Sequence, residues 1–341
     1  MPKNQYLSFL FWGLLHSLFG QTEKVSECLE LTQLTASTYI HTCNNNNGLV
    51  YISDQEAIII STPDSDQETQ NLIDWVKNKA KIIGYVIDRW HPDAMGGLDV
   101  VHKNAIPSYA NERTRSIAKE KGLAIAQVGF DEKLALDVGS QKIICHYLGE
   151  AHTGDGIVVW LPSEKILFGG NEIRNKGGWM GNIADANLSA WSKTAQSVKT
   201  HYGQAKVVVP GHGPYGSAKL IDFTIDLYSF PKNEACQDAA LSNELIQENA
   251  DEFHFLFSSK VRNEKQVIYS QGQVALNKKE KKIEIFADSI LYRPNKRTVY
   301  VPTGCIRITK KNQVESFSFH QLYLNLREDE VEFTLVIKEI R

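Results

Sequence analysis

The chain has 341 residues, of which 42% are hydrophobic and 23% are charged. This composition is that of a folded globular protein, and it excludes intrinsically disordered, collagen-like and polytopic membrane classes. The 37 Lys and Arg residues nearly balance the 40 Asp and Glu residues, and the net charge of -3 argues against nucleic acid as a partner. The length predicts about two domains.

The first 20 residues are predicted to form a signal peptide. Lys3 precedes an almost continuous apolar stretch from Tyr6 to Phe19, and the chain becomes polar after Gly20. The stretch is shorter than the roughly 20 residues that cross a bilayer as a helix, which favours a cleaved segment. His16 inside the stretch leaves an uncleaved anchor as the alternative. We therefore expect export to the periplasm, with no transmembrane segment after cleavage.

Export bears on the cysteines, because disulfides form under oxidising conditions. Cys28 and Cys43 lie symmetrically about a turn near residues 36–37, in a segment with the pattern of a β-hairpin. Cross-strand residues face each other in a hairpin, so a Cys28–Cys43 disulfide is predicted, with two unpaired thiols as the alternative. Cys145 lies in a strand-like segment and is expected to be a small buried apolar residue. Pairing of Cys236 with Cys305 stays open.

Residues 49–228 alternate between predicted strands and helices. Ser65 and Glu68, three residues apart, resemble a capping box and predict a helix through Val76. Such alternation is typical of layered α/β folds. The similar rhythm of the two halves predicts a four-layered αββα sandwich, with a doubly wound sheet as the alternative. The predicted strands are 49–52, 57–61, 81–87, 105–109, 141–147, 156–161, 165–168 and 207–210, and the further helices are 113–121, 190–202, 218–228 and one that starts near residue 95.

The composition changes near Phe230 and Pro231. Residues 232–251 are polar and acidic, and the pattern beyond them is almost entirely alternating strand, separated by turn residues such as Pro294-Asn295. We therefore predict three parts, namely a signal peptide 1–20, an αββα domain 21–231 and a small all-β domain 232–341. Nothing in the last part indicates a function.

Three histidines and an aspartate follow predicted strands directly. His91 and Asp93 come after one strand, with a glycine pair opening the next helix, while His152 and His212 each follow another strand and have glycines close by. These strand ends can converge on one edge of the sandwich. Neutral imidazole and carboxylate groups are ligands that zinc prefers. The residues therefore predict a zinc site at this edge.

Residues from about 29 to 230 resemble class B β-lactamases, the zinc enzymes of that name, and most of all their first, di-zinc subclass. The resemblance implies a metallo-β-lactamase-type αββα sandwich, and a hydrolase that opens β-lactam amide bonds with a metal-activated water. It does not extend to residues 232–341. It rests on motifs that follow one another in order, namely Leu49-Val50, His91-x-Asp93-x-x-Gly96-Gly97, Gly149-x-x-His152-Thr153-x-Asp155, Leu167-Phe168-Gly169-Gly170, Gly181-Asn182-Ile183-Ala184-Asp185-Ala186, Trp191 and Val208-Val209-Pro210-Gly211-His212-Gly213.

Two of the family's metal-ligand positions carry other residues here. The resemblance places Arg89 and Asn171 at these altered positions. A guanidinium repels a cation, and an amide oxygen is a poorer zinc ligand than a thiolate. One zinc ion rather than two is therefore expected, because the remaining metal ligands belong to two neighbouring sites. These expected ligands are His91, Asp93, His152 and His212.

The resemblance also implies roles in catalysis and substrate binding. Asp93 would orient the nucleophile, and Asn182 would lie beside the substrate carbonyl oxygen. Arg174 occupies the position that binds a substrate carboxylate in the family, a role that suits a guanidinium. The alternative for Arg174 is a solvent-facing charge at the end of a strand.

Three further positions bear on support for a metal. Ser61 stands where the family usually has a buried Asp behind the metal loop, and loss of such support weakens metal binding. Gly156 replaces a usual Asn. Glu172 is not expected to substitute for the ligand lost at Asn171, because adjacent strand residues point to opposite faces.

Three functions are compatible with these residues. The first is a zinc-dependent β-lactam hydrolase with a single metal, which would confer antibiotic resistance. The second is an exported hydrolase of another ester or amide on the same scaffold. The third is an exported pseudoenzyme in which Arg89 replaces the metal and pairs with Asp93. A small-molecule substrate is the expected partner of the first two, and the sequence predicts no oligomeric state.

Overall fold

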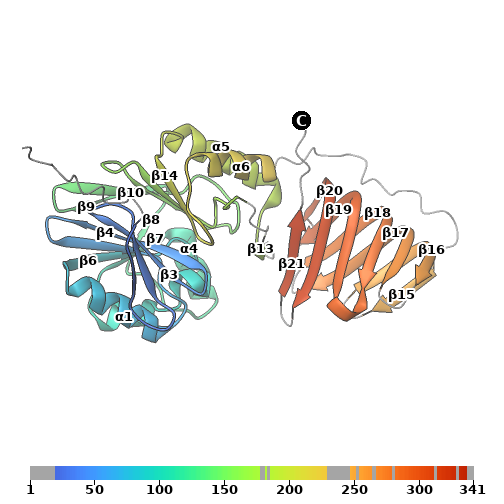
Figure 1. The fold of residues 1–341 in the computed structure, drawn as a ribbon, viewed down its shortest axis with the longest axis horizontal. Helices are drawn as coiled ribbons and strands as arrows, with labels where there is room; N and C mark the ends of the chain where they lie inside the picture. Colours follow the sequence, from blue (N-terminus) through green and yellow to red (C-terminus); the bar gives the residue numbers. More distant parts are fainter. Residues whose placement is uncertain are drawn as a thin grey trace, which may run out of the picture.

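The computed structural model describes residues 20–176, 181–182, 185–228, 246–250, 253–262, 266–278, 281–310, 313–327 and 330–335, which form three sheets and their connecting helices (Figure 1). Residues 1–19 of the predicted signal peptide lie outside this part of the chain. Within it, the helices are all too short or too polar to cross a membrane.

An eight-stranded sheet comes first, with its strands side by side in chain order. The strands up to β5 pair antiparallel through short turns, whereas β5 to β8 pair parallel. Parallel pairs need crossover connections, which are supplied by helices. The strands are β1 (Thr22–Lys24), β2 (Glu30–Gln33), β3 (Thr38–Cys43), β4 (Asn46–Ser53), β5 (Glu56–Ile60), β6 (Lys81–Val86), β7 (Ser108–Asn111) and β8 (Val128–Phe130), and the helices are α1 (Asp66–Lys77), α2 (Pro92–Met95), α3 (Leu98–Lys103) and α4 (Glu112–Glu120).

A five-stranded sheet forms the second half of the sandwich. Its strands lie in the order β14 (Val207–Pro210), β12 (Ile166–Gly170), β11 (Val158–Leu161), β10 (Gln141–His146) and β9 (Lys133–Val138). Strands β12 and β14 pair parallel, and helix α5 (Leu188–Tyr202) lies between them in the chain. Helix α6 (Lys219–Leu227) follows β14.

Alternating side chains of β5 show how the layers form. Ile58 and Ile60 pack in the cluster between the two sheets, while Ala57 and Ile59 pack against the helices on the other face. Both faces are buried, so the strand is apolar at every one of these positions. On the outer face of the second sheet, Val158 and other residues pack with α5 and α6. The predicted αββα sandwich is confirmed.

The start of α1 agrees with the predicted cap in part. The Ser65 side chain accepts a hydrogen bond from the backbone N–H of Glu68 at 3.2 Å, as an N-cap does. The Glu68 carboxylate instead accepts hydrogen bonds from Ser26 and Asn71. It therefore ties the N-terminal segment to the helix rather than closing a capping box.

The cysteines behave largely as predicted. Cys28 and Cys43 form a disulfide at the open end of the β2–β3 hairpin, with their Cα atoms 5.0 Å apart. Cys145 is a free, fully buried thiol. Cys305 is disulfide-bonded, and Cys236 lies outside the described residues.

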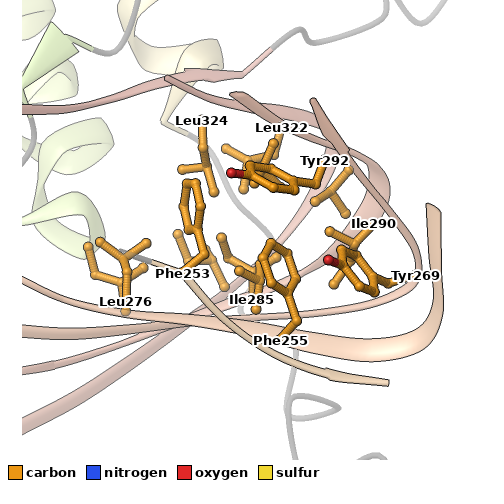
Figure 2. Packing of buried hydrophobic residues seen from close by; sticks show 14 of the residues in the cluster. Phe253, Phe255, Tyr269, Leu276, Ile285, Ile290, Tyr292, Leu322 and Leu324 are labelled. Atoms are coloured by element: carbon orange, nitrogen blue, oxygen red, sulfur yellow. The ribbon is translucent and has the colours of Figure 1, made fainter. Parts of the chain in front are cut away.

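The third sheet contains the C-terminal strands as an antiparallel meander, which we call the C-terminal sheet. Phe253 and Phe255 alternate along β16 and are fully buried, and Figure 2 shows them pointing towards Tyr292 and Leu324. Its edge next to β21 carries the short strand β13 (Gly181–Asn182). The meander consists of β15 (Ile246–Ala250), β16 (Phe253–Arg262), β17 (Val267–Lys278), β18 (Lys281–Arg293), β19 (Thr298–Lys310), β20 (Gln313–Arg327) and β21 (Glu330–Leu335), with a 3-10 turn at Pro294–Lys296.

The secondary structure differs from the predicted elements in three ways. Strands β1, β8, β9, β13 and β15 were not predicted, although β9 alternates between exposed positions and half-buried or buried ones. In the C-terminal part, β17 and β18 extend beyond the expected ranges 266–269 and 282–286, and the expected strands 297–301 and 305–309 form the single strand β19, because polar residues continue the backbone ladder beyond the apolar runs. The predicted strand at 105–109 lies further along the chain, at Ser108–Asn111.

Candidate functional site

Arg89 lies at the centre of the site, in the loop between β6 and α2. Only 2% of its side chain is exposed. Its Nη1 donates to Asp88 Oδ2 at 2.8 Å, and its Nη2 lies 2.5 Å from Asp93 Oδ2. Burial disfavours the charged guanidinium, but the carboxylates of Asp93 and Asp88 outweigh burial and raise the pKa of Arg89. Burial likewise opposes ionisation of Asp93, yet Arg89 holds the pKa of that carboxyl well below its usual range. The site is built around a permanent ion pair.

The second carboxyl oxygen of Asp88 is held by a neighbouring strand end. Its Oδ1 accepts a hydrogen bond from the Ser61 hydroxyl. Gly170, at the end of β12, has φ of +51°, and a Cβ there would lie 2.7 Å from Asp88 Oδ2. Both the backbone conformation and the close approach therefore require glycine. Ser61 stands where the family usually has a buried Asp. Here its hydroxyl instead donates to the carboxylate of Asp88.

Asn171, directly after β12, contacts the guanidinium of Arg89. With its amide oxygen turned to the guanidinium, it accepts hydrogen bonds from Arg89 Nη2 at 3.2 Å and Nε at 3.3 Å, and its nitrogen donates to His212 Nε2 at 3.2 Å. These neighbours determine the amide orientation, because the reverse orientation sets donors against donors. The two altered ligand positions, Arg89 and Asn171, therefore bind each other.

His212 reaches the same ion pair from the loop after β14. Its Nε2 lies 3.2 Å from Asp93 Oδ2. Asn47 fixes that loop, because its Nδ2 donates to the carbonyl oxygens of Pro210 at 2.9 Å and Gly213 at 2.8 Å. The expected ligands Asp93 and His212 are thus brought together, but they contact each other directly.

His91 and His152 form a second contact pair. His91 Nδ1 lies 3.3 Å from His152 Nε2, and His91 Nε2 lies 3.1 Å from Asp185 Oδ2. Burial, together with the charges of His91 and Arg89, lowers the pKa of His152 well below its ordinary value. His152 is therefore neutral, and its Nδ1 has no hydrogen-bond partner among the described residues.

Glu172 points into the protein beside the site. Its side chain is buried, and within the described ranges neither carboxyl oxygen has a hydrogen-bond partner. A Cβ at Gly156 would overlap Glu172 Oε1, so the glycine makes room for this carboxyl group. Burial and the neighbouring Asp155 raise the pKa of Glu172 well above its ordinary value. Glu172 is therefore a buried neutral acid.

The two predicted substrate-binding residues are Arg174, in the segment after β12, and Asn182, in β13. Arg174 is 7% exposed, and its backbone N–H donates to Thr224 Oγ1 of α6 at 2.8 Å. Burial lowers the pKa of Arg174. This placement rules out the alternative of a solvent-facing charge. Asn182 lies in β13, where its backbone pairs with Glu332 of β21, and its side chain is outside the described part of the structure.

The arrangement does not fit a zinc ion. The guanidinium of Arg89 takes up Asp93 and Asn171, two positions that would face a metal. No three His, Cys, Asp or Glu side chains in the described ranges form a group that could hold a metal ion. Of the four expected ligands, Asp93 contacts His212 and His91 contacts His152.

Sequence reasoning missed two carboxylates of this site. Asp88 neutralises Arg89, and Asp185 contacts His91. An acidic neighbour beside a buried arginine could have identified Asp88, because a buried charge needs a counter-charge. Asp185 belongs to a quoted motif, but its contact with a residue 94 positions away depends on the fold.

Comparisons with known proteins place these features in context. No protein-family model matches the chain. A metallo-beta-lactamase type 2 of Bacteroides fragilis is 38% identical over 213 residues, which cover 59% of this chain and 86% of the relative. A protein of the same description from Pseudomonas aeruginosa is 35% identical over 206 residues, covering 58% of this chain and 82% of the relative. The solved structure of a metallo-beta-lactamase from Pontibacter korlensis superposes with a TM-score of 0.56 at 32% identity, over 59% of this chain and 98% of that one.

Proposed function

The chain belongs to the metallo-β-lactamase family, a family of β-lactam hydrolases, and we propose that it is a pseudoenzyme member in which Arg89 replaces the metal. In this proposal the scaffold serves to bind a small molecule or a partner rather than to open an amide bond. The residues at the two altered ligand positions contact each other, since the amide oxygen of Asn171 accepts hydrogen bonds from Arg89.

The ion pair between Arg89 and Asp93 carries this proposal. Arg89 Nη2 lies 2.5 Å from Asp93 Oδ2, and both charges are held by the surrounding groups. A metal ion in this place would neutralise Asp93 and tie together the loop after β6, Asn171 and His212. The guanidinium makes the same connections with hydrogen bonds. A cation brought beside it would meet a fixed positive charge, which opposes binding.

The competing function is the single-zinc β-lactam hydrolase. Its support is the family relationship, together with the presence of four metal-capable residues in contact with one another or with Asn171, namely His91, Asp93, His152 and His212. It would require Arg89 to leave Asp93, one zinc to take these four ligands, and Asp93, Asn182 and Arg174 to act on a β-lactam as the resemblance implies. Breaking a buried ion pair costs about 3–5 kcal/mol, which zinc binding would have to offset.

Zinc content separates the two functions. Residues 21–341 are to be purified with excess zinc, and bound metal is to be measured beside hydrolysis of nitrocefin and a carbapenem. We expect close to no zinc and no turnover in the unaltered chain. The double variant Arg89→His with Asn171→Cys is expected to bind up to about two zinc ions, the number in di-metal sites.

A charge-preserving variant is the control for that experiment. Arg89→Lys keeps the positive charge and is expected to stay free of zinc, as the unaltered chain does. Stoichiometric zinc with β-lactam turnover in the unaltered chain would overturn the proposal in favour of the single-zinc hydrolase. If the double variant gains no zinc, Arg89 and Asn171 are not the altered ligand positions.

We also propose that the protein is exported to the periplasm after cleavage of residues 1–20, and that residues 21–231 and 232–341 form its two domains. Support for export comes from the apolar N-terminal stretch and from the Cys28–Cys43 disulfide, since disulfides persist in oxidising compartments. N-terminal sequencing of the mature protein tests the cleavage site, and a chain that begins at Met1 would contradict it.

A further inference from the structure

The C-terminal sheet extends into the part of the chain that carries the site. Strand β13 pairs antiparallel with β21, and the Cα partners are Gly181 with Phe333 and Asn182 with Glu332. Figure 1 shows β13 beside β21, at the side of the C-terminal sheet that faces the sandwich. Pairing of this kind satisfies an exposed sheet edge, which otherwise attracts other chains. The segment that contains Asn182 is therefore held by the last described strand.

A shared apolar cluster joins the same two regions. Trp191, Leu227 and Tyr228 of the sandwich belong to one buried cluster with Phe253, Phe255 and other residues of the C-terminal sheet. All five of these side chains are at most 3% exposed. A cluster that draws on both regions favours their association, because separating them would return apolar surface to water.

The shared cluster also touches the site. The Trp191 ring stacks on Tyr228 with a centroid distance of 3.8 Å. The ring centroids of Trp191 and His152 lie 5.7 Å apart in an edge-to-face arrangement. Trp191 Nε1 donates to the carbonyl oxygen of Glu172 at 2.8 Å. Trp191 therefore links the packing of the C-terminal sheet to the two segments that present His152 and Asn171.

We propose that the C-terminal sheet is a built-in closure of the site. It holds the β13 segment by strand addition and packs behind Trp191 and Tyr228, on the side where Asn182 and the buried Arg174 lie. A ligand that approached these residues would first have to displace the chain's own sheet. This inference is independent of whether the site binds zinc, since none of its contacts involves Arg89 or Asp93.

A cross-link in the full chain tests this closure. Partner residues of antiparallel strands have Cα atoms about 4.5–5.5 Å apart, within the range of about 4.4–6.8 Å that disulfides span. The pair Gly181→Cys with Phe333→Cys is therefore expected to form an intramolecular disulfide under mild oxidation. The disulfide is to be identified by mass spectrometry of the non-reduced digest. We expect cross-linking in most chains.

The matched control shifts the register by one residue. In Gly181→Cys with Glu332→Cys, the two side chains leave opposite faces of the sheet, and at least about tenfold less cross-linking is expected under the same conditions. Equal cross-linking in the two variants, or none in either, would overturn the proposed closure.

A second measurement needs no substitution. Hydrogen exchange followed by mass spectrometry on the unaltered chain reports whether the backbone amides of 181–182 are protected. In the closed arrangement, the peptide that contains β13 exchanges together with that of β21, and more slowly than an unpaired loop. Rapid exchange at 181–182 with a protected β20–β21 pair would show that the sheet does not hold this segment. Neither readout depends on metal content, so a failure here is distinguishable from a failure of the pseudoenzyme proposal.

Discussion

Buried charge is concentrated in the αββα sandwich where its strands end, whereas the C-terminal sheet buries mainly aromatic and aliphatic side chains. Arg89, Asp88 and Glu172 are at most 2% exposed, and they lie within or next to strand-end loops. In the described part of the C-terminal sheet, the buried polar residues are Gln273 and Glu284, which bond to each other at 2.7 Å. The sandwich thus keeps a charged centre that its fold must hold in place, while the sheet contributes apolar packing.

The two regions therefore depend on different kinds of contact for their stability. A buried charge is tolerated only with a counter-charge and hydrogen bonds, so the sandwich depends on specific partners at specific distances. Apolar packing depends on volume and shape and accepts many partners. Three substitutions separate these two kinds of stabilisation.

The largest effect is expected from removing the buried cation. Arg89→Met leaves Asp88 and Asp93 without their counter-charge, and loss of one partner of a buried pair costs about 3–5 kcal/mol. The free energy of unfolding is to be measured by urea denaturation with a chelator present. Glu112→Gln, in the more exposed Arg115–Glu112 pair, is the control, and a loss within about 1 kcal/mol is expected there. Equal losses in both variants would contradict a buried ion pair at Arg89.

An intermediate effect is expected from the neutral acid Glu172, and it depends on pH. Its folded pKa is raised, so its stabilising contribution is present below the unfolded value of 4.5 and is lost as the pH rises towards the folded value. Glu172→Gln removes this loss. As the pH rises above 5, the variant should gain stability relative to the unaltered chain, by at most about 1.4 kcal/mol per pH unit.

Urea midpoints at several pH values measure this dependence. Glu120→Gln, an exposed position in α4, is the control and should follow the unaltered chain. If Glu172→Gln follows it as well, the carboxyl of Glu172 ionises in the folded protein, and its environment is more polar than its burial indicates.

The smallest effect is expected in the C-terminal sheet. Phe255 stacks on Tyr269 with a centroid distance of 4.3 Å. Phe255→Leu keeps an apolar side chain but loses volume and the ring contact, for a cost of about 1–1.5 kcal/mol without any pH dependence. Val261→Ala, at an exposed position of the same strand, is the control. A pH-dependent loss at Phe255 would show that charge also matters in this region.

The sequence predicted the sandwich because its signals are local. Ile58, Ile59 and Ile60 are apolar at consecutive positions, as a strand buried on both faces must be, and Ser65 marks the start of α1. The Cys28–Cys43 disulfide followed from hairpin symmetry. Strand β9 was missed although Leu134, Leu136 and Val138 alternate with exposed residues, because only three apolar residues mark its inner face and two of them are half-buried.

The candidate site was predictable as a set of positions but not as a set of contacts. His91, Asp93, His152 and His212 follow strands that meet at one edge, and the altered residues Arg89 and Asn171 stand among them. The mutual hydrogen bonds of Arg89 and Asn171 depend on side-chain directions across more than 80 residues of chain, which periodicity does not report.

By itself, the sequence determined which chemistry is available: three histidines, one aspartate, one arginine and one asparagine that follow strands, and no cysteine among them. Only the tertiary structure decided how these groups pair, that Asp88 and Asp185 join them, and that β21 takes up the segment containing Asn182. The physical reason is range. Propensity and alternation act over a few residues, whereas ion pairing and strand addition depend on groups that folding alone brings together.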